Sequence, residues 1–135
     1  MEEYIGMITL FAGNYEPQYY MFCHGQILPI QRHTALFSIL GTTYGGNGTT
    51  TFALPDFRTR VLVGAGQGNH LSNVHLGETG GSSTAIVNAI LVEPAKAGGQ
   101  NVSISSAGTG THSNIQPSLG LNYIICVDGI YPSRP

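Results

Sequence analysis

Short runs of apolar, β-branched and aromatic residues alternate with turn signals along most of this chain. These runs cover 4–11, 19–23, 52–54, 61–64, 86–92 and 119–127. They end at turn-forming pairs such as Gly13-Asn14 and Asp128-Gly129. Runs of this length and composition, bounded by such turns, are typical of β-strands. The pattern therefore predicts a chain built mainly from short strands.

One stretch, 31–40, has a helical pattern instead. Its apolar residues Ala35, Leu36, Ile39 and Leu40 recur at the three- and four-residue spacing of a helix face. Gly41 follows directly, at the position where glycine commonly ends a helix. The sequence therefore predicts one short helix.

Glycine is frequent and limits the remaining structure. The chain has 135 residues, of which 19 are glycine. Two regions, 64–83 and 96–113, are so rich in Gly, Ser, Thr and Asn that they are predicted to be long loops. We expect one domain over 1–135, mainly β with one short helix (α+β minor), compact and with long loops.

Charge is scarce, and this excludes some partners. Only 9% of residues are Asp, Glu, Lys or Arg, against roughly 25% in an average domain. The five cations are scattered, so the sequence predicts no nucleic-acid binding. No apolar run approaches roughly 18 residues, so membrane insertion is not expected. A surface with few charges favours coverage by other subunits; the alternative is a monomer with a neutral polar surface.

Two cysteines, Cys23 and Cys126, lie in apolar, aromatic stretches near opposite ends of the chain. One interpretation is two buried, inert thiols. The other is a disulfide, which would close a long loop and contribute roughly 4–5 kcal/mol in the chain-entropy model. The disulfide requires the two segments to be neighbours.

Residue groups that carry chemistry are few. The glycine loop at 45–48 lacks the lysine of a phosphate-binding loop, so a turn is the favoured interpretation. Asp56 with Arg58 or Arg60 is expected to form an ion pair that holds its loop in place. No nucleophile or base lies beside that pair in the sequence. We therefore expect no enzyme activity and no cofactor.

The histidines do not have metal-ligand spacing. No two of the five show the H-x-H, H-x-x-H or i, i+4 patterns of metal sites. No metal site is therefore predicted. His112 is the first candidate for a site that would be completed by copies of the chain around a symmetry axis.

Several blocks resemble one family. They lie, in order, at 5–14, 23–28, 34–48, 51–58 and 112–125. They include Cys23-His24-Gly25-Gln26, the turn formed by Gly45, Gly46, Asn47 and Gly48, and the segment from Thr51 through Pro55 to Arg58. In these blocks the chain resembles the phage tail-collar domain family, and more closely its small bacterial branch of microcystin-dependent proteins. The resemblance implies a β-rich domain with a structural, host-attachment role and no catalysis.

The chain departs from the family pattern at a few positions. Tyr20, His24 and Thr59 stand where the family usually has Trp, Asp and Gly. The stretch 89–95 lacks the histidines that many members carry there, so a metal site of that kind is not carried over.

The sequence leaves three functions open. The first is a structural and adhesive tail-fibre-like protein that self-assembles, as a trimer or filament, and binds a cell-surface receptor. A glycan is the candidate receptor, with His112 and Asn114 as candidate surface-binding residues. The second is a self-polymerising extracellular filament subunit joined by strand addition. The third is a small-molecule-responsive binding module.

The expected location is extracellular or on a phage-like particle. Glu2 and Glu3 stand where a secretory signal peptide carries cations, so no signal peptide is visible.

Overall fold

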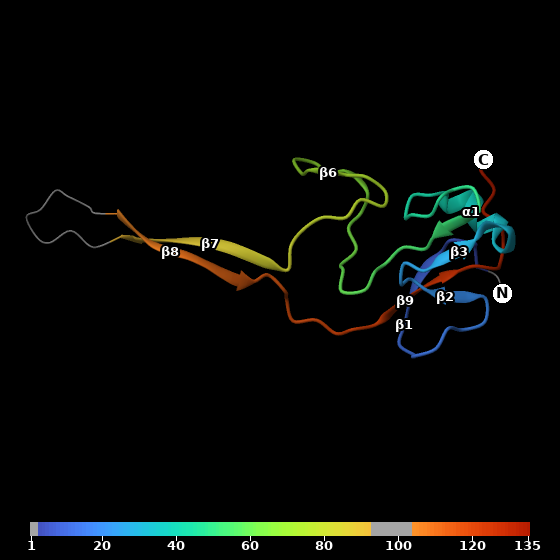
Figure 1. The fold of residues 1–135 in the computed structure, drawn as a ribbon, viewed down its shortest axis with the longest axis horizontal. Coiled ribbons are helices and arrows are strands. Elements are labelled where there is room, and N and C mark those ends of the chain that lie inside the picture. The colour runs from blue at the N-terminus through green and yellow to red at the C-terminus, as the bar shows by residue number, and fades with distance from the viewer. Residues whose placement is uncertain (1–2, 93–103) are drawn as a thin grey trace, which may run out of the picture. The chain divides into compact units, whose positions relative to one another are not determined.

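The computed structural model describes residues 3–92 and 104–135. The chain divides into two compact units (Figure 1). The first unit lies within Met1–Glu78 and Gly120–Pro135, and the second lies within Thr79–Leu119. The first unit therefore joins two segments from opposite ends of the chain.

A three-stranded antiparallel sheet forms the centre of the first unit. Its strands are β1 (Ile8–Phe11), β2 (Tyr20–Phe22) and β9 (Asn122–Cys126), in the order β1-β9-β2. The predicted runs at 4–11, 19–23 and 119–127 supply these strands, because β-branched and aromatic residues favour strand pairing. The strand nearest the C-terminus is thus the central one.

The two chain ends are held together beyond this sheet. Tyr4 and Ile130 form an isolated parallel bridge, and the Ile5 amide donates to the Ile130 carbonyl at 2.9 Å. The Cys126 amide donates to the Met7 carbonyl, also at 2.9 Å.

A second, two-stranded sheet and the helical region pack beside the first sheet. Strand β3 (Ile27–Pro29) pairs antiparallel with β4 (Thr51–Ala53). Between them lie a 3₁₀ turn, η1 (Ile30–Arg32), and the helix α1 (Thr34–Leu40). The predicted helix 31–40 is therefore split after its first residues. Gly41 ends it as expected, with φ +57° and its amide 2.7 Å from the Phe37 carbonyl.

The core of the first unit lies between the helix and the two sheets. Its most deeply buried side chains are Cys23, Leu36, Phe52, Leu54 and Ile125, whereas the equally buried Cys126 packs in a smaller cluster with Tyr20 and Ile124. Full burial of an aliphatic or aromatic side chain contributes roughly 1.5–3 kcal/mol. Because α1, β4, β9 and the residue that follows β2 all supply such side chains, the core joins segments that are distant in the sequence.

A long connection follows the second sheet. The run 61–64, predicted to be extended, forms no strand. Further along, β5 (Gly66–Gln67) and β6 (Asn73–Val74) pair antiparallel within the glycine-rich region predicted at 64–83. These two-residue strands bury little, so the region keeps the character of a loop.

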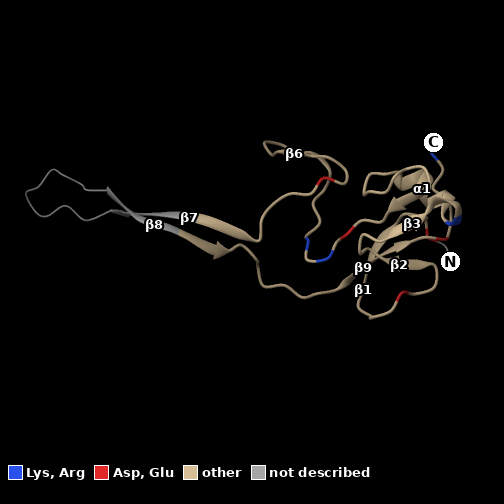
Figure 2. Ribbon diagram, in the orientation of Figure 1, with Lys and Arg blue, Asp and Glu red and all other residues tan. Residues whose placement is uncertain are grey.

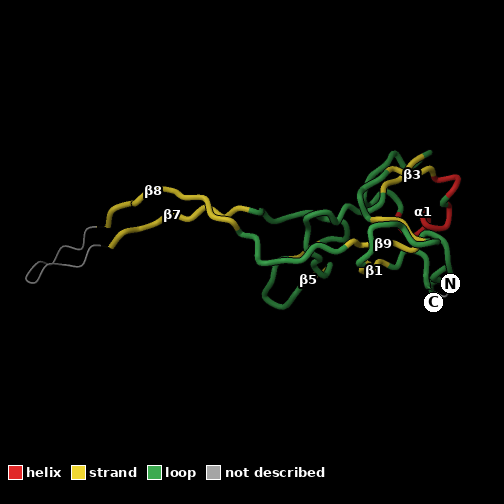
Figure 3. Tube along the Cα trace, turned by 90° about the horizontal axis from the view of Figure 1, so that it is seen from below, coloured by secondary structure: helices red, strands yellow, loops and turns green. Residues whose placement is uncertain are grey.

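The second unit is a hairpin of two long strands (Figure 3). Strand β7 (Thr84–Val92) pairs antiparallel with β8 (Ile104–Ser113), from Thr84 opposite Ser113 to Val92 opposite Ile104. The predicted strand at 86–92 is confirmed. The loop prediction for 96–113 is wrong from Ile104 onward, because cross-strand pairing overrides the weak strand preference of Gly and Ser. The part of it at 96–103 lies outside the described residues.

The fold class predicted from the sequence is confirmed: the chain is mainly β, with one short α-helix among its described elements. No helix in the described ranges is long and apolar enough to cross a membrane.

Candidate functional site

In the first unit, a set of backbone hydrogen bonds joins the turn after β2 to the loop after β4. They link the Gly25 amide to the Pro55 carbonyl at 3.1 Å, the Leu54 amide to the Gln26 carbonyl at 3.1 Å and the Phe57 amide to the Cys23 carbonyl at 3.1 Å. Two sequence blocks thirty residues apart are thereby locked together. We call this feature the motif junction, formed by residues 23–26 and 54–58.

Gln26 and Gly25 shape the turn of the motif junction. The side-chain nitrogen of Gln26, Nε2, donates to the Phe22 carbonyl at 2.7 Å, and the side-chain oxygen, Oε1, accepts from the His24 backbone amide at 3.1 Å. Gly25 has φ +70°, and a Cβ there would lie 3.1 Å from the Asp56 Cβ. Both the backbone conformation and the close approach of Asp56 therefore require glycine at this position.

Asp56 and Arg58 form an ion pair on the outside of the motif junction. Arg58 Nε and Nη2 donate to the two Asp56 carboxylate oxygens at 2.9 and 2.8 Å. Nη2 also donates to the His24 carbonyl at 3.1 Å. These hydrogen bonds from Arg58 lower the pKa of Asp56 to about 2. The pair therefore holds the loop against the turn, and both side chains are substantially exposed.

Arg60, the other candidate partner of Asp56, is not part of this pair. Its backbone amide donates to the Phe57 carbonyl at 3.2 Å, and its side chain forms no ion pair within the described part of the chain. Thr59, between the two arginines, has φ +58°. That is the left-handed region, which a β-branched residue adopts only at a cost.

The glycine turn at 45–48 is organised by Asn47. Its side-chain oxygen accepts from the amides of Thr49, Thr50 and Thr51 at 2.9, 2.8 and 3.0 Å. The amides that could cradle a phosphate are thus already satisfied inside the turn. At Gly46, a Cβ would lie 2.3 Å from the Phe52 Cα, so the turn lies directly against β4.

The candidate disulfide between Cys23 and Cys126 is not present, and both thiols are free. Cys126 stands opposite Tyr20 in the sheet, whereas the Cys23 amide donates to the Tyr123 carbonyl at 2.9 Å. Neighbouring positions along a strand face opposite sides, so the two sulfur atoms point to opposite faces of the sheet. Cys23 packs with the core around Leu36, and Cys126 packs with Tyr20.

Neither thiol is suited to act as a nucleophile. Burial raises the pKa of Cys23 to about 12 and also raises that of Cys126. His24, next to Cys23 in the sequence, stacks its ring on Phe22 at a centroid distance of 5.1 Å. The interpretation of two buried thiols is therefore the one the geometry supports.

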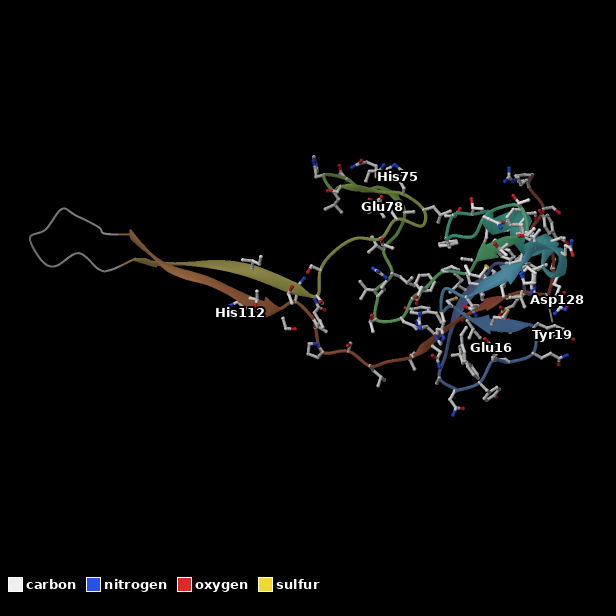
Figure 4. All side chains as sticks on the ribbon, viewed as in Figure 1. Glu16, Tyr19, His75, Glu78, His112 and Asp128 are labelled. Atoms are coloured by element: carbon white, nitrogen blue, oxygen red, sulfur yellow. The ribbon has the colours of Figure 1, made fainter. Side chains whose placement is uncertain are left out.

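The remaining candidate residues, His112 and Asn114, lie in the second unit. Figure 4 labels His112 there. His112 is exposed on β8, opposite Ala85. Asn114 follows β8, where its amide and side chain donate to the carbonyls of Ser83 and Ser82 at 2.8 and 3.2 Å. Asn114 thus closes the open end of the hairpin, a role that its place in the sequence did not reveal.

Other groupings of polar side chains are small and exposed. His75 contacts Glu78 at 3.0 Å within one turn, labelled in Figure 4. The described residues contain no group of three His, Cys, Asp or Glu side chains able to hold a metal ion. A shallow hollow of about 120 Å³ is lined mostly by apolar side chains, among them Ile8, Ile39 and Leu76. It lacks the converging polar groups that fix a small ligand.

Exposed apolar side chains are the feature that the strand pattern did not anticipate. Val61 is 86% exposed, with Leu62 and Val63 exposed beside it, and Leu119 is 87% exposed. Charged residues are sparse throughout (Figure 2). Scattered single apolar residues are common on protein surfaces, whereas these three follow one another in an extended segment.

Two comparisons place this geometry among known proteins. Residues 6–62 match the family model described as Phage Tail Collar Domain. The chain is also similar to the short tail fiber protein gp12 of Enterobacteria phage T4, with 36% identity over 70 residues. That match covers 51% of this chain and only 13% of the phage protein.

The matched segment 6–62 contains β1 to β4, α1, the glycine turn and the whole motif junction. The resemblance seen in the sequence blocks is thereby confirmed at the level of the family. Residues 6–62 therefore match the phage tail collar domain, and this match spans less than half of the chain.

Proposed function

We propose that this chain is a structural, tail-fibre-like protein that assembles with copies of itself and attaches to a cell surface. The observation that carries the proposal is the exposure of large apolar side chains, Val61 to Val63 and Leu119 foremost, on a chain with very little charge. The match to the tail collar domain and the similarity to a phage short tail fiber protein support it.

The argument for self-assembly is energetic. Each apolar side chain left in water forgoes roughly 25 cal/mol per Å² of surface that a partner could cover. Charges normally keep identical chains apart, and only 9% of this chain is charged. Copies of the same chain are therefore the simplest partner for these surfaces. The proposed place of work is a phage-like particle or another extracellular assembly.

The argument for attachment rests on aromatic side chains in a polar loop. Tyr15 is 64% exposed and stacks edge-on against Phe11 at 5.3 Å, which orients its ring without covering it. Asn14 and the partly exposed Tyr19 lie in the same loop between β1 and β2. A tyrosine ring offers an apolar face and a polar tip, a combination that suits a sugar. His112 on the hairpin is a second exposed candidate.

Attachment is tested with Tyr15→Ala in a binding assay on whole cells and on a panel of glycans. We expect the variant to lose most of the binding of the unaltered chain. Tyr131→Ala is the matched control, because Tyr131 is also a half-exposed tyrosine of the first unit but lies outside the β1–β2 loop. Equal binding by the unaltered chain and Tyr15→Ala would remove this loop from the proposal.

A second candidate function is a self-polymerising extracellular filament subunit joined by strand addition. Strand β9 already lies between β1 and β2, so it is not free to join a neighbour's sheet, whereas the N-terminal strand β1 lies at a sheet edge. The observation that favours this candidate is the β7–β8 hairpin, whose outer strand edges pair with no other described strand. Microscopy of the purified chain distinguishes the two functions: regular filaments support the second, and discrete particles support the first.

A further inference from the structure

The hairpin of the second unit is unusual for a strand pair that forms its sheet alone. Strands β7 and β8 have nine and ten residues, and their sheet contains no third described strand. Each strand therefore presents one full edge of backbone amides and carbonyls on its outer side. An isolated two-stranded ribbon is at best marginally stable in water, and three or more strands are normally required.

The hairpin also lacks the length limit and the side chains by which proteins commonly protect open edges. Natural edge strands are short, or carry lysines, other charges or prolines. Neither 84–92 nor 104–113 contains a charged residue or a proline. In Figure 2, the parts of β7 and β8 that are not grey carry no charged residue. β7 is rich in Val, Ile and Leu, the residues that favour strand pairing, and Ile86 is 73% exposed.

The missing charges indicate what kind of partner covers these edges. In an assembly of identical chains around one axis, a charge on the hairpin is repeated in every copy at short distance, so the copies would repel one another. A hairpin without charges avoids that repulsion. A differently charged partner would leave the opposite signature, a cluster of complementary charges, and the two strands have none.

We propose that the hairpins of neighbouring copies form one continuous intermolecular sheet, in which β7 of one chain pairs with β8 of the next. This inference rests on the proposed self-assembly and names the element that carries it. When copies are related by rotation about one axis, their hairpins run in the same direction. The contact from β7 to β8 of the next copy is then antiparallel, like the pairing inside each hairpin.

This arrangement satisfies the edges better than a two-fold one. Pairing of β7 with β7 of a second copy would leave both β8 edges open. Pairing of β7 with β8 is head-to-tail, so it leaves no open edge once the ring closes, and it builds a filament when the rotation does not close. The register shift between Asn88 and Ile90 marks an irregularity that increases the local twist. Greater twist helps a small number of hairpins to curve into a ring.

The first experiment places a charge at the hairpin. Ile86→Lys and Thr111→Lys occupy opposite, exposed positions of the register, and Gln18→Lys is the matched control on the exposed β1–β2 loop. Assembly of the full chain is followed by light scattering across a concentration series. We expect either hairpin variant to raise the concentration needed for assembly by about tenfold or more. The control should leave it unchanged.

The outcomes separate this inference from the proposed function. If the unaltered chain assembles and the hairpin variants assemble equally well, self-association stands and the hairpin inference is wrong. If the unaltered chain is a monomer at every concentration, both are wrong. Circular dichroism and thermal unfolding check that each variant keeps the fold of the first unit.

A second experiment tests the order of the strands. Chains with Ile86→Cys and chains with Thr111→Cys are co-expressed and treated with a short thiol cross-linker, to which the buried native cysteines are poorly accessible. We expect mixed cross-links between the two variants to exceed those within either one. A majority of links between two Ile86→Cys chains would overturn the head-to-tail order in favour of β7 pairing with β7.

Discussion

At the scale of single residues, the collar domain depends on a few backbone conformations and one ion pair. The non-glycine residues with positive φ in the described ranges are Tyr19, Thr59 and His70, and their own sequence neighbourhoods do not predict this conformation. Thr59 was marked only by the family resemblance, which has glycine at that position. The structure supplies the reason, since φ +58° is a conformation that glycine adopts without strain.

We predict that Thr59→Gly stabilises the chain. Relief of the left-handed strain is worth roughly 1–2 kcal/mol. Glycine has more conformational freedom in the unfolded chain, and this cancels roughly 0.5–1 kcal/mol of the gain from relief of strain. The free energy of unfolding, measured in denaturant, should rise by the difference. Thr49→Gly, an exposed threonine without positive φ, should instead lower it. A Thr59→Gly chain less stable than the original would contradict the strain argument.

The ion pair of Asp56 predicts a pH dependence of stability. The folded pKa of Asp56, about 2, lies below its usual 3.8. The stabilisation is therefore complete above pH 3.8 and is lost as the pH falls toward 2. We predict that the stability difference between the original chain and Arg58→Ala shrinks over this window, while Arg60→Ala shows no such trend. A constant difference from neutral pH down to the folded pKa would argue against the pair.

At the scale of elements, the sequence predicted those stabilised by their own composition. The strands at 8–11, 20–22 and 122–126 and the helix at 34–40 were all found within predicted runs, because their apolar residues form the core. β8 was missed because its Gly, Ser and Ala residues carry little strand signal without the pairing partner β7. Likewise, the run 61–64 looks like a buried strand, yet Val61 and Val63 face solvent.

The candidate site was foreseen unevenly, for the same physical reason. Asp56 and Arg58 are neighbours in the sequence, so their pairing could be predicted. The links of Arg58 and Gly25 across thirty residues required the fold. The separation of Cys23 from Cys126 depends on strand register, which a sequence of two apolar runs does not determine.

The glycine turn gives a prediction at this scale. Asn47→Ala removes one acceptor shared by three backbone amides, and water can replace it only in part because the turn packs against β4. We expect a loss of about 1–2 kcal/mol in the free energy of unfolding. Asn47→Asp, which keeps the acceptor, should lose less. Asn14→Ala is the control. If Asn14→Ala lowered the free energy of unfolding as much as Asn47→Ala, Asn47 would have no special role in the turn.

The sheet register predicts the chemistry of the two cysteines. Cys23 and Cys126 face opposite sides of the sheet, so the folded chain should keep both thiols free after mild oxidation. Intact mass under non-reducing conditions, with thiol alkylation after unfolding, measures this. Two alkylated cysteines are expected; a mass lower by two hydrogen atoms, with none alkylated, would show a disulfide and a different register.

At the scale of the whole molecule, three features of one chain favour assembly. The first unit contains the segment that matches the collar domain, the hairpin of the second unit supplies open strand edges, and the sparse charge permits identical chains to approach. Composition alone indicated covered surfaces, but it did not indicate where they lie. The structure locates exposed apolar side chains at 61–63 and 119 and unpaired edges on β7 and β8.

The most direct test of the central claim is the molecular mass of the unaltered full chain in solution, measured by light scattering over a wide range of concentration. The account predicts an assembly whose mass is a whole-number multiple of the chain, or a filament that grows with concentration. A single-chain mass throughout that range would contradict self-assembly, and with it the proposed role of the exposed apolar surface.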